Sequence, residues 1–272
     1  MEFKSAYESK KPDAQGIVHY TNDENQVWHT LYTRQMKLVP GRACDEFLKG
    51  LEILGLSADR IPQVKEINER MGAVTGWGVD PVAALISPDE FFGLLANRKF
   101  PAATFIRRVE ELNYVKEPDI FHEIYGHCPL LTEPIYADFV RRYGQKVLTM
   151  DKNDWPLMQR LFWFTVEFGL IQTPAGLRTY GGGILSSIEE TVYCVESPKP
   201  QRKPFDPVEV FRTPYRIDCL QPIYFVIESY QQLYDFIESD IPALLKKARE
   251  LGEYPPAFEV DGSANEHINY CC

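Results

Sequence analysis

The stretch Asp119-Ile-Phe-His122-Glu-Ile-Tyr-Gly-His127-Cys-Pro129 decides how this chain folds and which chemistry it can perform. It places two of the five histidines of the chain within six residues of each other. In an ideal α-helix, residues five apart point about 140° away from each other, which is too divergent for two ligands of one metal ion. Because Gly126 and Pro129 flank His127, we expect the helix to end or distort there and to bring His127 back toward His122.

A carboxylate follows 40 residues after His127, at Glu167 in the aromatic run Leu161-Phe-Trp-Phe-Thr-Val-Glu-Phe-Gly-Leu170. It is the one residue of that run that can carry a charge. A buried carboxylate needs a cation beside it, and either a divalent metal or an arginine meets that need. Two histidines and one carboxylate are typical of mononuclear Fe(II) oxygenases. They are also found in zinc hydrolases, where Glu123 would act as the general base.

Composition excludes several classes of protein. The 272 residues are 44% hydrophobic and 25% charged, which indicates a sizeable core and not a disordered chain. A formal net charge of −10 argues against nucleic acid or an anionic membrane as a partner. The charged N-terminus does not fit a signal peptide, and no apolar run is long enough to span a membrane. Six cysteines without paired spacing indicate a reducing compartment, so we expect a cytoplasmic protein. No role is predicted for Cys271 and Cys272.

Helical patterns dominate the chain. Apolar residues at intervals of three and four predict helices around residues 27–32, 47–54 and 64–71, the last two ending near Gly55 and Gly72. Helix starts with a serine cap are predicted at three further places, which are Ser87, Ser187 and Ser229.

The predicted fold class is mainly α, or α+β with few short strands. The clearest strand candidate is 223–227, and the proline-rich segment 198–222 is predicted to be an irregular loop. We expect residues 1–20 to form a loose N-terminal arm and residues 21–272 to form a single catalytic domain.

Four blocks of the sequence, at 118–130, 162–170, 180–187 and 221–224, resemble the pterin-dependent aromatic amino acid hydroxylases, most closely the bacterial phenylalanine 4-hydroxylases. The resemblance runs over about residues 20–255 and implies the single-domain catalytic fold of that family. It implies oxidation of L-phenylalanine to L-tyrosine by O2, with mononuclear non-haem Fe(II) and tetrahydrobiopterin or a related tetrahydropterin as cofactors. Hydroxylation of tryptophan or tyrosine is the alternative within the family, and a zinc-dependent hydrolase is the alternative from another class.

The resemblance assigns iron and pterin residues. It implies that iron is bound by His122, His127 and Glu167. The residues that resemble the pterin site are a stacking ring, a main-chain segment and an acid that contacts pterin through water. These are Phe91, Leu85, Ile86 and Glu123.

The resemblance assigns the substrate pocket as well. Arg107 matches the arginine that binds the substrate carboxylate, and Asp119 matches the acid that orients this arginine. One group of the remaining residues would surround Glu167 with a dry, apolar pocket. The other group lies on the triglycine segment, which faces the substrate. Together the two groups are Trp163, Phe168, Gly183 and Ser186 as substrate-binding residues and Phe162 as a catalytic residue.

The chain also departs from the family pattern. Ala84 and Pro88 stand where many members have Gly and Ser, close to the implied pterin site. Ile217 stands where tyrosine hydroxylases tend to have an acid, and its apolar side chain suits phenylalanine. The expected partners are small molecules only, and the expected assembly is a monomer or homodimer.

Overall fold

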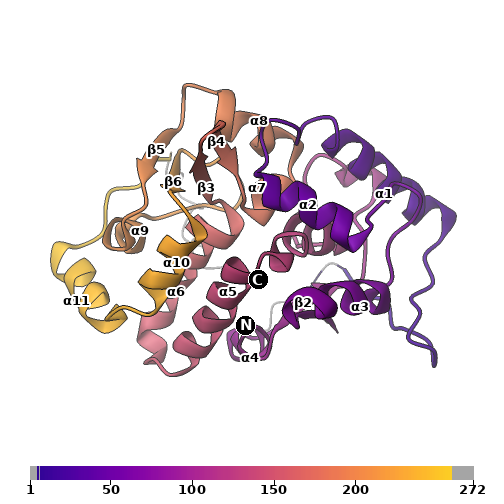
Figure 1. The fold of residues 1–272 in the computed structure, drawn as a ribbon, viewed down its shortest axis with the longest axis horizontal. Coiled ribbons are helices and arrows are strands. Elements are labelled where there is room, and N and C mark those ends of the chain that lie inside the picture. Colours follow the sequence, from indigo (N-terminus) through magenta and orange to yellow (C-terminus); the bar gives the residue numbers. More distant parts are fainter. Residues whose placement is uncertain (1–4, 6, 259–272) are drawn as a thin grey trace.

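The computed structural model describes residue 5 and residues 7–258, about half of which are helical, with few residues in strands (Figure 1). This confirms the mainly α class. Two segments are π-helical, η2 (Phe121–His127) and η5 (Trp163–Glu167). The α-helices are α1 (Asn22–Gln35), α2 (Asp45–Leu54), α3 (Val64–Thr75), α4 (Pro88–Ala96), α5 (Pro134–Leu148), α6 (Trp155–Phe162), α7 (Gly182–Leu185), α8 (Ile188–Glu196), α9 (Pro207–Arg212), α10 (Tyr230–Ile237) and α11 (Ile241–Leu251). Short 3-10 turns are η1 (Val109–Glu111), η3 (Leu130–Thr132) and η4 (Lys152–Asp154).

The strands form two small sheets. The first pairs two parallel strands, β1 (Gly78–Val82) and β2 (Lys99–Ala103). The second has the order β4-β3-β6-β5, in which only β3 and β4 are antiparallel. Its strands are β3 (Leu170–Thr173), β4 (Gly176–Thr179), β5 (Gln201–Pro204) and β6 (Ile223–Ile227). Strand β6 coincides with the predicted strand.

The segment 198–222 is not wholly irregular, so that prediction was wrong. It contains β5, which pairs with β6 from Gln201 opposite Ile223, and it contains helix α9. Pro207 occupies the first position of α9, where its missing N–H is not needed, and the side chain of Asp206 caps the helix. Proline is therefore compatible with both elements.

The predicted helix boundaries are confirmed in most cases. The caps Ser87, Ser187 and Ser229 each accept a hydrogen bond from the backbone N–H three residues later. Helix α2 ends at Gly55, which has a positive φ of 59°. Helix α3 continues past Gly72 and ends at Gly76, because Gly76 and not Gly72 adopts the left-handed conformation that stops a helix.

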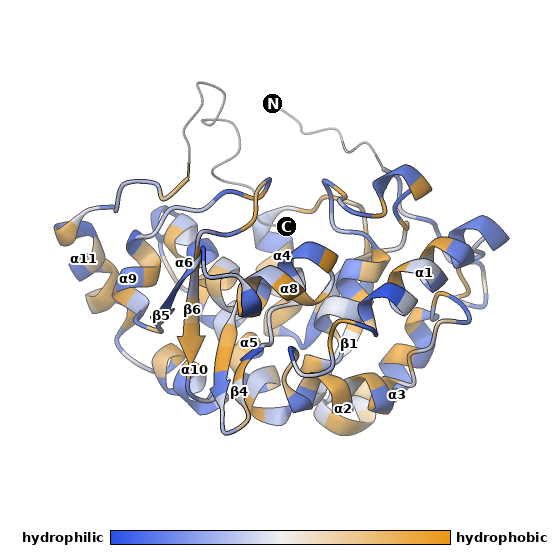
Figure 2. Cartoon of the chain, turned by 90° about the horizontal axis from the view of Figure 1, so that it is seen from above, coloured by the Kyte–Doolittle hydropathy of each residue, from blue (hydrophilic) through white to orange (hydrophobic). Residues whose placement is uncertain are grey.

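The long helix α5 lies between the N-terminal and C-terminal helices, where it contacts α4 and α10 (Figure 1). One hydrophobic core cluster extends from Val27 in α1 to Ala248 in α11. The outer helices have a hydrophobic and a hydrophilic side, which is visible for α2 and α11 in Figure 2. Within the described residues, no helix combines the length and apolarity needed to cross a bilayer.

The N-terminal arm makes specific contacts over its described part. The ring of Tyr7 stacks on Phe105 with centroids 4.5 Å apart and an angle of 10°. The backbone N–H of Thr104 donates to Ser9 Oγ at 3.1 Å, and the hydroxyl of Tyr20 donates to the carbonyl of Thr104 at 2.9 Å. The arm is thus attached to the segment that follows β2, two residues before Arg107.

Helix α2 packs closely against the chain just after His127. A Cβ added at Gly50 would lie 2.1 Å from the carbonyl oxygen of Pro129, so only glycine permits this approach. Gly93 in α4 is different, because a Cβ there would meet no atom within 4 Å.

These two glycines give a matched pair of predictions. Gly50→Ala should lower the free energy of unfolding by about 1–3 kcal/mol, because backbone atoms of Pro129 must move. Gly93→Ala should raise it by up to about 1 kcal/mol, because alanine favours the helical state and has room. Denaturant unfolding of both variants tests this, and equal stability of the two would contradict the packing described here.

Candidate active site

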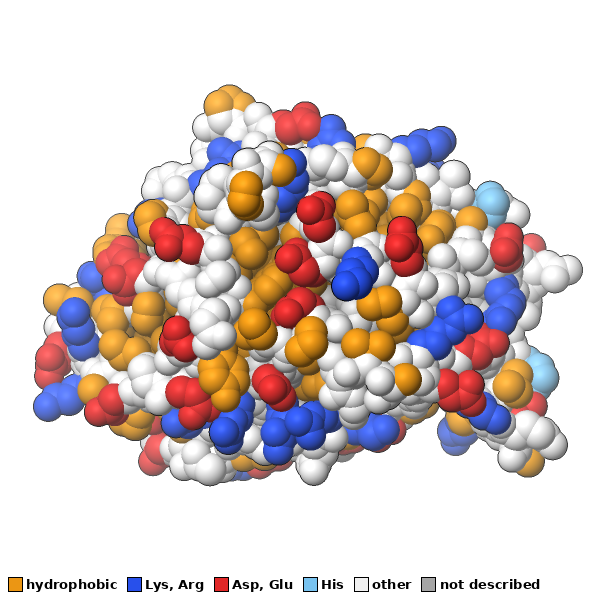
Figure 3. Space-filling model, viewed as in Figure 1, with side chains coloured by type: hydrophobic (Ala, Val, Ile, Leu, Met, Phe, Trp, Pro, Cys, Tyr) orange, Lys and Arg blue, Asp and Glu red, His pale blue; other side chains and the backbone are white. Residues whose placement is uncertain are grey.

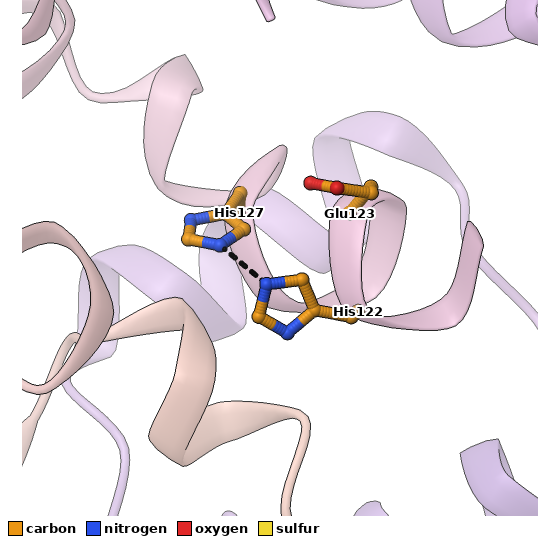
Figure 4. A group of neighbouring side chains, drawn as sticks. All are labelled: His122, Glu123 and His127. Carbon is orange, nitrogen blue, oxygen red and sulfur yellow. Dashed lines mark hydrogen bonds between the residues drawn. The ribbon is translucent and has the colours of Figure 1, made fainter. Parts of the chain in front are cut away.

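The segment that carries both histidines is π-helical, so the helix is distorted as expected but does not end at Gly126. In a π-helix the backbone hydrogen bonds join residues five apart, which brings His122 and His127 to the same side. Their Nε2 atoms face each other at 3.1 Å (Figure 4). Gly126 has another function, because a Cβ there would lie 2.7 Å from the carbonyl oxygen of Gly182. The sequence predicted the convergence of the two rings but not its cause.

Glu167 lies at the end of the second π-helix, η5. The hydroxyl of Thr165 donates to the carbonyl of Leu161 at 2.6 Å, which competes with the bond that an α-helix would form there. The N–H of Phe168 instead bonds to the carbonyl of Trp163, five residues earlier, at 2.8 Å. These bonds shape the turn that directs the Glu167 carboxylate toward the two histidines.

The three side chains meet at one point. Glu167 Oε1 lies 3.2 Å from His127 Nε2, and Glu167 Oε2 lies 3.6 Å from His122 Nε2. Two atoms that each bind an ion at about 2.1 Å and at right angles to each other are separated by about 3 Å. The separations among these three side chains therefore fit neighbouring ligands of a single metal ion.

The hydrogen bonds of His122 fix which of its nitrogens carries the proton. The hydroxyl of Ser186 donates to the carbonyl of Gly182 at 2.9 Å, so its oxygen accepts from His122 Nδ1 at 2.9 Å. The proton of the neutral ring is then on Nδ1, and Nε2 presents its lone pair to the shared point. His127 is held mainly by packing, since its ring lies 4.7 Å from that of Phe100.

The charge of the site favours a cation. Burial lowers the pKa of His122 to about 4, so this ring is neutral at neutral pH. Burial alone would raise the pKa of Glu167, but the two histidines and the N–H of Gly183 outweigh it and lower the pKa. An ionised carboxylate and a neutral imidazole thus face the shared point, and this donor set suits a divalent metal.

Glu123 is a second carboxyl group near the histidines. Its ligand atom and theirs lie within 4.8 Å of one another, and Figure 4 shows Glu123 beside the histidine pair. Burial, together with the charges of Glu167 and Asp119, raises the pKa of Glu123 well above its usual value. A protonated carboxyl is a poor metal ligand and a good hydrogen-bond donor. Glu167, which is ionised and contacts both rings, is the better third ligand.

The triglycine segment packs against these side chains. A Cβ at Gly181 would lie 2.2 Å from the carbonyl oxygen of Glu167, and one at Gly182 would lie 2.4 Å from His127 Nδ1. A Cβ at Gly183 would lie 2.9 Å from Glu167 Oε2. Because these glycines have no side chains, the segment can pack directly against His127 and Glu167.

A cavity of about 470 Å³ opens above this site. Several of the expected pterin and substrate residues line it together with His122 and Glu167, namely Phe91, Ile86, Glu123, Arg107, Trp163, Phe168, Gly183 and Ser186. Leu85 and Phe162 are not among the lining residues. Phe162 lies behind the wall, where its ring packs edge-on against Phe91 at 5.3 Å. Its contribution is to hold the ring of Phe91.

Arg107 and Asp119 form a buried ion pair at the side of the cavity. The guanidinium donates through Nε to Oδ2 and through Nη2 to Oδ1 of Asp119, both at 2.8 Å. Asp119 also accepts from the backbone N–H of His122 at 3.0 Å, so it both orients the arginine and caps η2. Burial alone would raise the pKa of Asp119, but the charge of Arg107 and the hydrogen bonds from Arg107 and the His122 N–H together outweigh it and lower the pKa. Arg107 Nη1 has no hydrogen bond within the described part of the chain.

Among the parts of the cavity wall that had no assigned role in the sequence analysis are two loop segments. The segment 113–118 contributes Asn113, Tyr114, Val115, Lys116 and Pro118, and residues 218–220 extend the wall beside Ile217. Neither segment has a pattern that distinguishes it from a surface loop. Asp119 and Gln221 belong to two of the blocks that carry the resemblance. The positions of the two segments next to these residues could have indicated that they line the site.

Comparisons with known proteins agree with this geometry. Residues 2–250 match the family described as biopterin-dependent aromatic amino acid hydroxylase. A phenylalanine-4-hydroxylase of Pseudomonas aeruginosa is 52% identical, over 93% of this chain and 96% of its own length. The structure of phenylalanine hydroxylase from Legionella pneumophila is 65% identical with a TM-score of 0.91, covering 92% of this chain and all of the other.

A third relative contains a metal. The structure of Chromobacterium violaceum phenylalanine hydroxylase with bound oxidised Fe(III) is 43% identical, with a TM-score of 0.85 and coverage of 93% and 94% of the two chains. These matches extend over nearly the whole chain. The chain therefore belongs to the biopterin-dependent aromatic amino acid hydroxylase family.

Proposed function

We propose that this chain hydroxylates L-phenylalanine to L-tyrosine, using O2 and a tetrahydropterin at a mononuclear non-haem Fe(II) site. The observation that carries the proposal is the meeting of His122, His127 and Glu167 at the base of a cavity large enough for a small-molecule substrate. The relatives named phenylalanine-4-hydroxylase support the choice of substrate. Family membership decides against the zinc hydrolase. Ile217 in the cavity wall favours phenylalanine over tyrosine, since it offers no partner to a phenol.

In this proposal His122, His127 and Glu167 would hold the iron at the base of the cavity. When bound, the iron would activate O2, and the tetrahydropterin would supply the two electrons that reduce the second oxygen atom to water. The protein excludes water with Trp163 and Phe168, whose rings lie 4.3 Å apart beside Glu167.

Other residues bind and orient the organic molecules. The ring of Phe91 offers a flat face to the pterin, and Glu123, whose pKa burial raises, can offer an O–H donor to it. Arg107 binds the substrate carboxylate, and its pairing with Asp119 fixes the direction of the guanidinium plane. Ser186 acts through His122, whose ring it orients.

We also propose one catalytic domain, a monomer or homodimer, and a cytoplasmic location. The continuous core from α1 to α11 supports the single domain. On the face shown in Figure 3, apolar side chains are interspersed with charged ones, which supports a small assembly. The cysteines within the described residues are free thiols, as expected in a reducing compartment. Light scattering during gel filtration would test the assembly.

The function is tested with protein purified anaerobically and loaded with Fe(II). Tyrosine should form from phenylalanine only when a tetrahydropterin and O2 are both present. Tryptophan and tyrosine, offered in parallel, test the alternatives within the family. Tyrosine formation without pterin, or none at all from iron-loaded protein, would refute the proposal.

The ligand assignment predicts a contrast between two glutamates. Glu167→Gln, like His122→Ala and His127→Ala, should lose stoichiometric iron and more than 90% of turnover, roughly the loss expected when one of three ligands is removed. Glu123→Gln should retain iron, because an amide replaces a carboxyl that is already neutral. Metal analysis after anaerobic gel filtration distinguishes them, and Fe(II) should raise the Tm of Glu123→Gln but not of Glu167→Gln.

The Arg107–Asp119 pair leads us to expect that replacing Arg107 affects both substrate binding and stability. Arg107→Ala should raise the KM for phenylalanine at least about tenfold, because it removes a charge-assisted contact to the carboxylate. It should also lower stability by about 3–5 kcal/mol, because Asp119 stays buried without its partner. Arg107→Ala with Asp119→Asn should recover part of the stability while the KM stays high. A normal KM in the single variant would show that the carboxylate binds elsewhere.

A further inference from the structure

Gln221 lies behind the cavity wall, and each polar atom of its side chain is hydrogen-bonded. Its Oε1 accepts from the indole N–H of Trp163 at 3.0 Å. Its Nε2 donates to the carbonyls of Arg216 at 2.8 Å and Cys219 at 2.9 Å. Because an indole N–H only donates and a carbonyl only accepts, the orientation of the amide is unambiguous. One side chain, only 1% exposed, thus joins π-helix η5 to the segment 216–220.

Both partners of Gln221 form the wall of the cavity. The ring of Trp163 stacks on Tyr215 with centroids 4.5 Å apart, at an angle of 17°, and also packs against Phe168. The segment 216–220 contributes Ile217, with the three residues after it, to the same cavity. The amide of Gln221 therefore fixes the position of an aromatic face relative to an aliphatic one.

Glu190 in α8 holds Gln221 in place. Its Oε1 accepts from the backbone N–H of Gln221 at 3.1 Å and from the hydroxyl of Tyr224. Glu190 is only 4% exposed and also lines the cavity. Three separate elements, η5, α8 and the strand β6 that begins at Ile223, are connected in this way around one side of the pocket.

We propose that Gln221, held by Glu190, is a positioning residue that sets the width of the pocket for the substrate ring, and so the preference for phenylalanine over the larger tryptophan. The inference rests on the proposed function. Without the amide, the Trp163 N–H and two carbonyls lose buried partners, and they regain partners only by moving toward water. A pocket rejects extra ring atoms only if its wall stays fixed, so this movement weakens selectivity.

The test uses Gln221→Leu, which keeps the approximate length of the side chain and removes its polar atoms. The readout is the ratio of kcat/KM for phenylalanine to that for tryptophan, measured in one preparation, which does not depend on the fraction of active enzyme. We expect this ratio to fall about tenfold, mainly through a higher KM for phenylalanine, with iron content retained. Gln172→Leu is the control, because Gln172 is exposed on β3 and its side chain donates only to the carbonyl of Thr173. Its ratio should match that of the unaltered protein.

A second measurement and a second variant distinguish a failure of this inference from a failure of the proposed function or of folding. The ratio of the affinities for phenylalanine and tryptophan, from calorimetry, should change in the same direction, and it tests the inference even if the unaltered protein makes no tyrosine. Gln221→Glu keeps an acceptor for Trp163 but has at most one O–H donor for the two carbonyls, so it should shift both ratios in a chain whose packing is nearly unchanged. Ratios within about twofold of the unaltered protein in either folded variant would overturn the proposal. If neither variant folds, Gln221 maintains the fold and not the pocket width, and the proposal is equally overturned.

Discussion

The site depends on the π-helical form of the two segments that carry its ligands. His122 and His127 are five residues apart, a spacing that separates them in an α-helix and brings them together in η2. Glu167 ends η5, where the hydroxyl of Thr165 takes a backbone carbonyl and the N–H of Phe168 reaches back five residues. Neither segment would direct its side chains to the shared point in ordinary helical form.

The three buried or partly buried carboxyl groups near this point differ in the direction of their pKa shifts, each with a local cause. Asp119 is ionised because Arg107 binds it through two hydrogen bonds. Glu123 has a raised pKa because it is buried and lies near two other negative charges, which favours its protonated form. Glu167 is ionised beside imidazole rings, and no arginine or lysine among the described residues pairs with it. The cavity therefore has a carboxylate at its base that attracts a divalent cation, and an acid of raised pKa that can donate a hydrogen bond.

The sequence predicted the parts of this structure that depend on local patterns. Serine caps at Ser87, Ser187 and Ser229 and the strand at Ile223–Ile227 were found because each has a signal within a few residues. Gly126 and Pro129 beside His127 predicted a distortion but not a π-helix, which depends on hydrogen bonds and on the approach of Gly182 from a distant segment. Packing behind the wall, such as Phe162 against Phe91, has no local signal at all.

The four blocks that carry the family resemblance are far apart in the sequence and meet around one cavity. The first two contain η2 and η5, and the third contains the glycines that touch both His127 and Glu167. The fourth begins with Gln221, which bonds to Trp163 in the second block. Residues of one block therefore contact residues of another block around the cavity. This explains why they predicted the chemistry of the chain well, while the amphipathic stripes of the outer helices predicted only its secondary structure.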